Sequence, residues 1–235
     1  MKEKILRILD NYYHIIKDEK TAEELQKFIE MMLEYNKIHN LTSITDVDEV
    51  ILKHLLDSVL PIGLLKETDR ILDIGCGAGF PSVPLAIVNR NLNITAIDSV
   101  QKKTDFVGLV KNELKLDNLT VHHTRIEDFA RLEGERESYD VVLSRAVAPL
   151  NVIVEYSAPM LKDGGYIFAY KGVNFEEEIK VAQKAFRILD CSFEDVTGFH
   201  IYELETNRYV IRIRKNSKII PKYPRKQNKP RIKPL

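Results

Sequence analysis

Several features that define other classes of protein are missing from this sequence. Its two cysteines, Cys76 and Cys191, give neither a disulfide framework nor the spacing of a zinc site. No apolar run approaches the roughly 18 residues needed to span a bilayer. Residues 1–4 (MKEK) open a mixed-charge stretch instead of an apolar signal core. These absences favour a cytoplasmic protein with no bound metal and no membrane partner.

Acidic residues are missing from the end of the chain. Residues 206–235 contain no Asp or Glu and eleven Lys or Arg. The first 205 residues hold all 35 acidic residues and the other 24 basic ones, so they carry a net charge of −11 in a chain that is neutral as a whole. Such asymmetry favours a basic tail that binds a polyanion, most simply a nucleic acid. A solvated tail with no partner is the alternative.

The most informative segment that is present covers residues 71–80 (ILDIGCGAGF). It reads as a buried strand, a turn with glycines at 75, 77 and 79, and the start of a helix. Glycine lets the backbone turn tightly and approach a ligand, and the helix start offers free N–H groups. Asp98 ends a second apolar run 23 residues after Gly75. A glycine turn with an acid about 20 residues later predicts a nucleotide-like ligand whose ribose hydroxyls meet the acid.

The residues around the turn indicate which ligand it holds. A dinucleotide fingerprint needs a small residue at its last position, where this chain has Phe80. A GxGxG turn with an acid, Asp73, two residues before Gly75 is typical of S-adenosylmethionine (SAM) methyltransferases. Asp73 would hold the amino end of SAM, and Phe80 would pack against it. The alternative is a tight turn with no ligand.

Strand and helix patterns alternate from residue 70 onward. Strands are predicted over 70–74, 93–97, 118–122, 139–144 and 165–170, and helices over 81–88, 100–115, 149–161 and 174–188. This alternation predicts a parallel sheet with helices on both faces. Two more strands, 191–199 and 207–214, have no helix between them and are expected to pair antiparallel. Asp163, Gly164 and Gly165 are expected to turn into the fifth strand.

Helical patterns fill the first quarter of the chain. We predict helices over about 2–16, 22–37 and 47–60, the second with a capping box of Thr21 and Glu24 and the third ending near Pro61. Four prolines predict an irregular tail. The expected division is therefore a helical N-terminal extension (1–62), an α/β domain (63–215) and a basic C-terminal tail (216–235).

Several predicted strand ends carry polar residues, and ligands of parallel sheets bind at those ends. Glu127 would accept from an adenine amino group while Ile126 stacks on the ring, although acids also favour helix starts for their own sake. Arg145 follows an apolar strand and would hold a phosphate or base edge, or pair with an acid. His54 and Asp57 share one helical face, where a histidine with a purely structural role is an equal alternative.

Two familiar kinds of base methylation lack their signatures here. Transfer to an exocyclic amine often uses an Asn/Asp-Pro-Pro-aromatic loop after the fourth strand, where this chain has residues 144–147 (SRAV). Transfer to cytosine C5 needs a cysteine nucleophile, and neither Cys76 nor Cys191 has the expected position.

Together these segments resemble the GidB family, the bacterial small-subunit ribosomal RNA methyltransferases G. The likeness covers nearly the whole chain and is carried by Asn36, Asn40-Leu41-Thr42, His54, Asp57-Ser58, residues 72–81, Asp98-Ser99, Lys102-Lys103, Arg125, Glu127, Ser144-Arg145-Ala146, Lys171-Gly172 and Tyr223-Pro224-Arg225-Lys226. The tail departs slightly, because Gln227-Asn228 replaces the family's frequent glycine-containing turn.

The resemblance implies a Rossmann-like class I SAM-dependent methyltransferase fold, mostly parallel with an antiparallel last strand pair and a helical N-terminal extension. It implies methyl transfer from SAM to N7 of a specific guanine in 16S rRNA. By resemblance the SAM contacts are Gly75, Phe80, Ile126, Glu127 and Arg145, and by position we add Asp73, Gly77 and Asp98. Arg145 is also the expected positioning residue for catalysis. The expected RNA contacts are His54, Lys171, Lys222, Arg225 and Lys226.

Guanine N7 has an in-plane lone pair and no proton, so the reaction needs no general base, and none is evident. We expect a monomer that acts on 16S rRNA or the small ribosomal subunit. A SAM methyltransferase with another nucleic acid or a small molecule as substrate, and an assembly factor that binds SAM without turnover, are the alternatives. A nicotinamide enzyme is disfavoured by Phe80.

Overall fold

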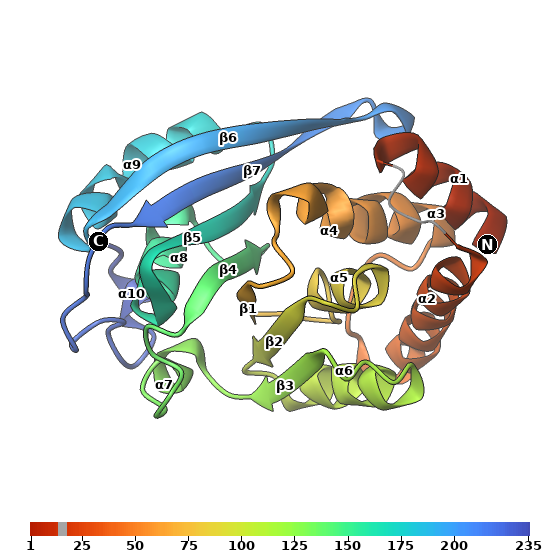
Figure 1. Ribbon diagram of the computed structural model, residues 1–235, viewed down its shortest axis with the longest axis horizontal. Coiled ribbons are helices and arrows are strands. Elements are labelled where there is room, and N and C mark those ends of the chain that lie inside the picture. The colour runs from red at the N-terminus through yellow and green to blue at the C-terminus, as the bar shows by residue number, and fades with distance from the viewer. Residues whose placement is uncertain (14–17) are drawn as a thin grey trace.

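The computed structural model describes residues 1–13 and 18–235 and contains a seven-stranded sheet with helices on both faces (Figure 1). The strands are β1 (Arg70–Ile74), β2 (Asn93–Asp98), β3 (Leu119–His123), β4 (Tyr139–Arg145), β5 (Leu161–Lys171), β6 (Cys191–Ile201) and β7 (Thr206–Lys215). Their order is β3-β2-β1-β4-β5-β7-β6. Strands β1 to β5 pair in parallel, and β7 runs antiparallel to both β5 and β6. The predicted fold class, including the antiparallel last pair, is confirmed.

The helices follow the predicted alternation closely. They are α1 (Lys2–Tyr13), α2 (Glu19–His39), α3 (Val47–Val50), α4 (Asp57–Val59), α5 (Ser82–Val88), α6 (Gln101–Glu113), α7 (Ile126–Phe129), α8 (Leu150–Ser157), α9 (Phe175–Ile188) and α10 (Lys229–Ile232). A π-helical turn, Ile51–Leu56, joins α3 to α4, and 3-10 turns cover Leu60–Leu64, Ala158–Met160 and Tyr202–Leu204.

Two hydrophobic cores lie on opposite faces of the sheet. Successive side chains of a strand point to opposite faces, and β1 accordingly contributes Ile71 to one core and Leu72 and Ile74 to the other. The first core also holds α1, α2, α5 and α6, and the second holds α8 and α9. The N-terminal helices therefore share one core with the sheet, and Figure 1 shows α2 beside α5 and α6.

The chain order of the strands fixes where a ligand would bind. The first crossovers lead from β1 to β2 and β3 on one side, and β4 then returns to the other side of β1. Loops that leave β1 and β4 in opposite directions open a crevice at their carboxyl ends. The glycine turn after β1 and the residues after β4 flank this crevice.

Several element boundaries differ from the predictions. Helix α2 begins one turn early because the carboxylate of Asp18, and not the predicted Thr21, caps it by accepting from the Thr21 N–H at 2.8 Å. Aspartate is at least as good an N-cap as threonine. Residues 14–16 of the first predicted helix lie outside the described residues. The third helix leaves α geometry at Val59, close to the predicted end near Pro61, and continues as a 3-10 turn whose first turn contains Pro61, where no N–H is needed.

The start of β5 and the tail also differ from the predictions. Strand β5 begins at Leu161, before the predicted turn, and the turn residues form an irregularity inside the strand, with Gly164 at φ +80°. The tail, predicted to be irregular, contains the short helix α10. Two residues of the tail, Tyr223 and Pro230, are buried. The sequence did not predict these contacts, because a proline-rich stretch has no periodic pattern of apolar residues.

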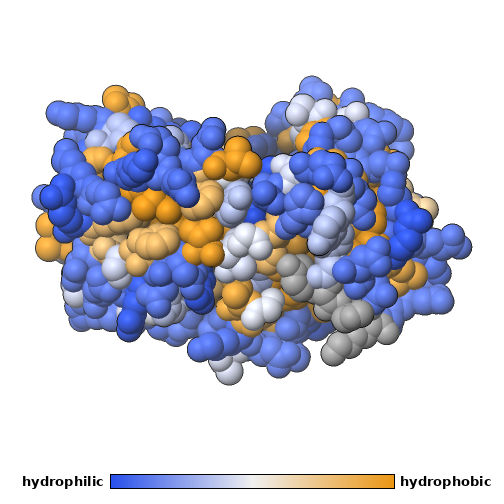
Figure 2. Space-filling model, turned by 90° about the horizontal axis from the view of Figure 1, so that it is seen from above, coloured by the Kyte–Doolittle hydropathy of each residue, from blue (hydrophilic) through white to orange (hydrophobic). Residues whose placement is uncertain are grey.

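The surface seen in Figure 2 is mostly hydrophilic, with apolar residues gathered in separate patches. Within residues 1–13 and 18–235, no helix has both the length and the hydropathy that crossing a membrane would require.

Candidate functional site

The turn after β1 is built by three glycines, two of which leave no room for a side chain. Gly75, Gly77 and Gly79 have φ values of +71°, +56° and +91°. A Cβ at Gly75 would lie 2.9 Å from Val147 Cγ2, and one at Gly79 would lie 2.6 Å from Val83 Cγ2. Both distances are too short for two carbon atoms that are not bonded, so a side chain would clash at either position. The turn is held to the sheet because the N–H groups of Gly75 and Cys76 both donate to Ile97 O. Backbone amides and a short helix therefore lie at the end of β1.

Asp98 ties the end of β2 to this turn. One carboxylate oxygen accepts from the Gly77 N–H at 3.0 Å and the other from the Val100 N–H at 2.9 Å. Asp98 is mostly buried yet lines the cavity described next. The acid predicted from spacing is thus held in place by the glycine turn.

A cavity of about 450 Å³ opens at the carboxyl ends of β1, β2 and β4. This volume is in the range of sites for small organic ligands. Four of the predicted cofactor residues line it: Gly75, Asp98, Ile126 and Glu127. The remaining lining residues are Ser99, Val100, Lys103, Arg125, Ala146, Val147, Tyr156, Asn228 and Arg231. None of these nine was predicted as a site residue, and nothing local to Asn228 or Arg231 signals their position.

Glu127 and Ile126 give one end of the cavity an acidic acceptor beside an apolar surface. Glu127 is buried, and its Oε1 accepts from the Asn228 N–H at 3.0 Å. Ile126 is half-buried at the start of α7. This pairing suits a flat, partly apolar group that carries an amine.

Asp73 lies beneath the glycine turn and is fully enclosed. Its Oδ2 accepts from the Ser82 N–H at 3.3 Å, while Oδ1 is buried with no hydrogen-bond partner. A buried acceptor without a donor is costly. Burial raises the pKa of Asp73 to about 7. The unused oxygen makes Asp73 a fitting partner for a cationic amine brought by a ligand.

Arg145, His54 and Asp57 meet in one buried network, although the sequence separates them widely. Arg145 Nε donates to Asp57 Oδ2 at 2.8 Å, and one terminal nitrogen donates both to His54 Nδ1 at 2.7 Å and to Lys53 O at 3.1 Å. Arg208 lies 3.5 Å from the other Asp57 oxygen. Arg145 therefore joins the end of β4 to the π-helical turn.

Charges in this network are set by burial. Burial, and then the charge of Arg145, lowers the pKa of His54 to about 4. Its ring is therefore neutral at pH 7 and accepts at Nδ1. Burial raises the pKa of the Asp57 carboxyl, while Arg145 and Arg208 act to lower it. The network holds one carboxylate between two arginines.

Phe80 lies away from the cavity lining. Its ring centroid is 5.0 Å from that of Phe28 and 4.9 Å from that of His54, and the Arg145 guanidinium lies 5.7 Å from it. Asp73, Gly77, Phe80 and Arg145 thus stand behind the lining residues. Whether they contact a cofactor stays a prediction.

The predicted RNA contacts fall into two groups. Lys171 pairs with Glu178 at 2.6 Å, Arg225 pairs with Glu155 at 2.6 Å, and His54 belongs to the buried network. Lys222 and Lys226 are exposed. Among the residues that the structure describes, no group of three or more His, Cys, Asp or Glu is arranged to hold a metal ion.

The raised pKa of Asp73 predicts how stability changes with pH. The folded chain holds this proton more tightly than the unfolded chain, whose carboxyl titrates near 3.8, so stability is lost as pH rises from about 4 through 7. His54 acts in the opposite sense, since its lowered pKa removes stability as pH falls from 6.5 toward 4.

Asp73→Asn isolates the first effect. Without ligand, its free energy of unfolding relative to wild type should be higher at pH 8 than at pH 5, because only the wild type buries a charge at pH 8. Urea unfolding at both values measures this. An equal difference at the two pH values would contradict the assignment.

Comparisons with known proteins agree with this geometry. The family profile described as GidB, rRNA small subunit methyltransferase G, matches residues 21–207. A curated relative from Desulfitobacterium hafniense (strain Y51), named ribosomal RNA small subunit methyltransferase G, is 41% identical over 220 residues, which cover 92% of each chain. One of the same name from Streptococcus pneumoniae (serotype 19F, strain G54) is 41% identical over 216 residues, 91% of each chain.

Solved structures share the fold. A SAM-dependent methyltransferase from Aquifex aeolicus superposes with a TM-score of 0.56 at 18% identity, covering 77% of this chain and 98% of that one. TYW2 from M. jannaschii, solved in complex with AdoMet, superposes with a TM-score of 0.56 at 16% identity, covering 74% of this chain and 79% of that one. At these identities the likeness supports the fold alone.

Proposed function

The chain belongs to the GidB family, rRNA small subunit methyltransferase G, and on that basis we propose that it transfers a methyl group from SAM to N7 of a guanine in 16S rRNA. The observation that carries the proposal is the family match combined with a cavity at the strand ends where Gly75, Asp98 and Glu127 meet. The cytoplasm, where ribosomal subunits are made, is the proposed location, and a monomer the proposed state.

The residues present fit SAM at three points. The orphaned Oδ1 of Asp73 would accept from the ammonium of the amino-acid end. Asp98, already oriented by two amides, would meet the ribose hydroxyls. Ile126 and Glu127 would hold the adenine. When bound, SAM supplies an electrophilic methyl group on a sulfonium.

The chain's own contribution to the reaction is alignment and charge. Guanine N7 presents a lone pair and no proton, so no residue has to remove one. Alignment of two reactants can supply a large part of a rate enhancement. Arg145 serves this as a positioning residue, because its network fixes the strand end that carries Ala146 and Val147 into the cavity wall. A carboxylate near the target base would favour the cationic purine that forms.

The substrate base must be accessible. N7 faces the major groove, which is too deep and narrow in A-form RNA for side chains to enter. We therefore propose that the target guanine lies in a loop or bulge.

Incubation with radiolabelled SAM and unmodified small ribosomal subunits tests the function directly. The proposal expects label in 7-methylguanosine after nucleoside chromatography. Label in another nucleoside would overturn the N7 assignment, and bound SAM without any transfer would favour an assembly role.

The exposed lysines of the tail are expected to contact RNA phosphates. Replacing Lys226, Lys229 and Lys233 together by Gln should weaken RNA binding and reduce the slope of log K against log salt by roughly 0.7–0.9 for each phosphate that is no longer neutralised. Filter binding at several salt concentrations measures it. Lys66, Lys180 and Lys184, equally exposed elsewhere, are the matched control triple. Equal slopes for both triples would rule out this tail contact.

A further inference from the structure

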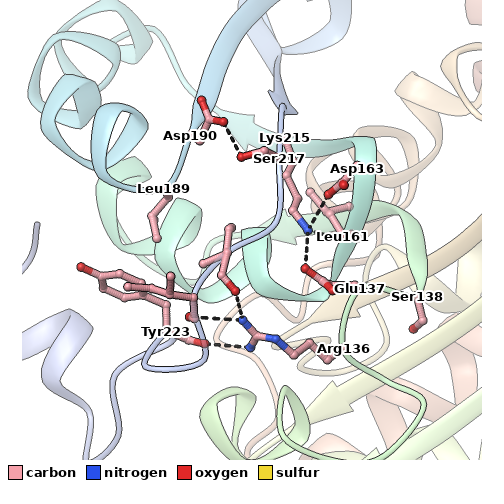
Figure 3. Close-up of polar contacts among 12 residues, drawn as sticks. Arg136, Glu137, Ser138, Leu161, Asp163, Leu189, Asp190, Lys215, Ser217 and Tyr223 are labelled. Carbon is pink, nitrogen blue, oxygen red and sulfur yellow. Dashed lines mark hydrogen bonds and ion pairs between the residues drawn. The ribbon is translucent and has the colours of Figure 1, made fainter.

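The last part of the chain, residues 219–235, is anchored to the domain and will be called the C-terminal segment. Its first residues are held by Arg136, whose terminal nitrogens donate to Ile219 O at 2.7 Å, Ile220 O at 3.3 Å and Tyr223 O at 2.9 Å (Figure 3). Arg131 donates to Pro224 O at 2.6 Å. Two arginines from the loop before β4 thus fix the path of the C-terminal segment.

A buried ion pair holds the middle of the segment. Glu155 of α8 is fully buried, and Arg225 meets it with its backbone N–H at 2.9 Å, Nε at 2.8 Å and a terminal nitrogen at 2.6 Å. A buried carboxylate needs such a partner, since leaving it unpaired is strongly destabilising. The docked position is therefore specified by the domain itself.

Beyond this pair the segment reaches the cavity. The Asn228 N–H donates to Glu127 Oε1 at 3.0 Å, and the Tyr156 hydroxyl donates to Asn228 Oδ1 at 3.2 Å. Arg231 donates to Val147 O at 3.0 Å. Asn228 and Arg231 both line the cavity. Asn228 thus fixes one carboxylate oxygen of Glu127 and does not bond to the other. Arg231 holds Val147, the residue that packs on the glycine turn.

Other residues of the same segment face solvent and are basic. Lys222, Lys226, Lys229 and Lys233 are exposed, and no acidic residue occurs after Glu205. Phosphate groups of RNA bind to such sites chiefly through charge. One short stretch of chain therefore contains both residues that line the cavity and exposed lysines available to RNA.

We propose that the C-terminal segment is a wall of the SAM site, with Asn228 as the positioning residue for Glu127, and that it couples SAM binding to RNA binding. This inference rests on the proposed function. Because the two ligands would order the same segment from its two sides, each should raise the affinity for the other by the same factor. Binding of RNA would favour the docked segment and hence the complete SAM site.

Arg136→Ala is the test, because it removes the contacts that hold the first residues of the segment without touching the cavity lining. SAM affinity measured by calorimetry should fall by roughly 2- to 30-fold, the effect of residues that act through a network. Arg90→Ala is the matched control, since Arg90 also donates to backbone carbonyls, those of Leu114 and Lys115, at a site remote from the segment. It should bind SAM as the wild type does.

If Arg136→Ala fails to fold, amide hydrogen exchange of the wild type tests the inference instead. SAM should slow amide exchange within residues 223–232, and a 16S rRNA transcript should slow it further and raise SAM affinity. Unchanged exchange on SAM addition, or equal SAM affinity of Arg136→Ala and wild type, would overturn the inference while leaving the proposed function intact. A wild type that binds no SAM would instead overturn the proposed function.

Discussion

Asp73→Asn is expected to bind SAM at least about 30-fold more weakly than the wild type, because truncating one side of a buried charged contact costs about 2 kcal/mol or more. The amide keeps the shape of the side chain and an oxygen for the Ser82 N–H. It removes the charge that would meet the ammonium of SAM. Calorimetry at pH 8, where the wild-type carboxyl with its pKa of about 7 is mostly ionised, gives the largest contrast.

The same variant separates this role from a folding defect. Without ligand, Asp73→Asn should gain stability relative to wild type at pH 8, so reduced affinity and increased stability would appear together. Asp140→Asn is the control, because Asp140 lies at the other end of β4 and accepts from the Arg70 N–H and Lys162. Its SAM affinity should be unchanged. Unaltered affinity of Asp73→Asn would remove Asp73 from the cofactor site.

Arg145→Ala is expected to lower kcat by about 100-fold, the effect of a misplacement of roughly 1 Å at a site that works by alignment. It should also lower the free energy of unfolding by about 3–5 kcal/mol, because Asp57 would stay buried with only Arg208 near it. Single-turnover methylation and urea unfolding measure the two effects.

Arg145→Lys distinguishes positioning from stability. Lysine keeps the charge beside Asp57 but cannot reach Asp57, His54 and Lys53 O together from one planar group. Stability should be largely recovered, whereas kcat should remain low with little change in SAM affinity. Arg212→Ala, which breaks the pair with Asp195 on the last strands, is the control and should leave kcat unchanged. Full recovery of kcat in Arg145→Lys would make the role of Arg145 purely structural.

The sequence predicted those parts of the molecule that depend on local pattern. Alternating apolar runs indicated all seven strands within a few residues, and the glycine turn with Asp98 located the cavity. Ile126 and Glu127, predicted from their place after the third strand, line the same cavity. These features follow from the period of side chains along a strand and from turn chemistry, which neighbouring residues determine.

Contacts between distant segments were beyond such reasoning. Arg145, His54 and Asp57 each stood out in the sequence, but their meeting depends on how the N-terminal helices pack on the sheet. The same packing brings Phe80 against Phe28, a contact that the sequence did not predict, while its expected contact with the ligand stays a prediction. Asn228 reaches the cavity only because Glu155 and Arg136, both far away in the chain, hold the segment that carries it.

The π-helical turn over Ile51–Leu56 gives the chain one place where its length can change by a residue. A π turn contains one residue more than an α turn, so it corresponds to a helix with a single inserted residue. Deleting one residue there would let the helix close to α geometry, and Asp57 would keep nearly its present orientation relative to Val50, because the π turn spreads about the same rotation over one more residue. Val50 would stay in the core and Asp57 beside Arg145. A single deletion should therefore be tolerated in this turn.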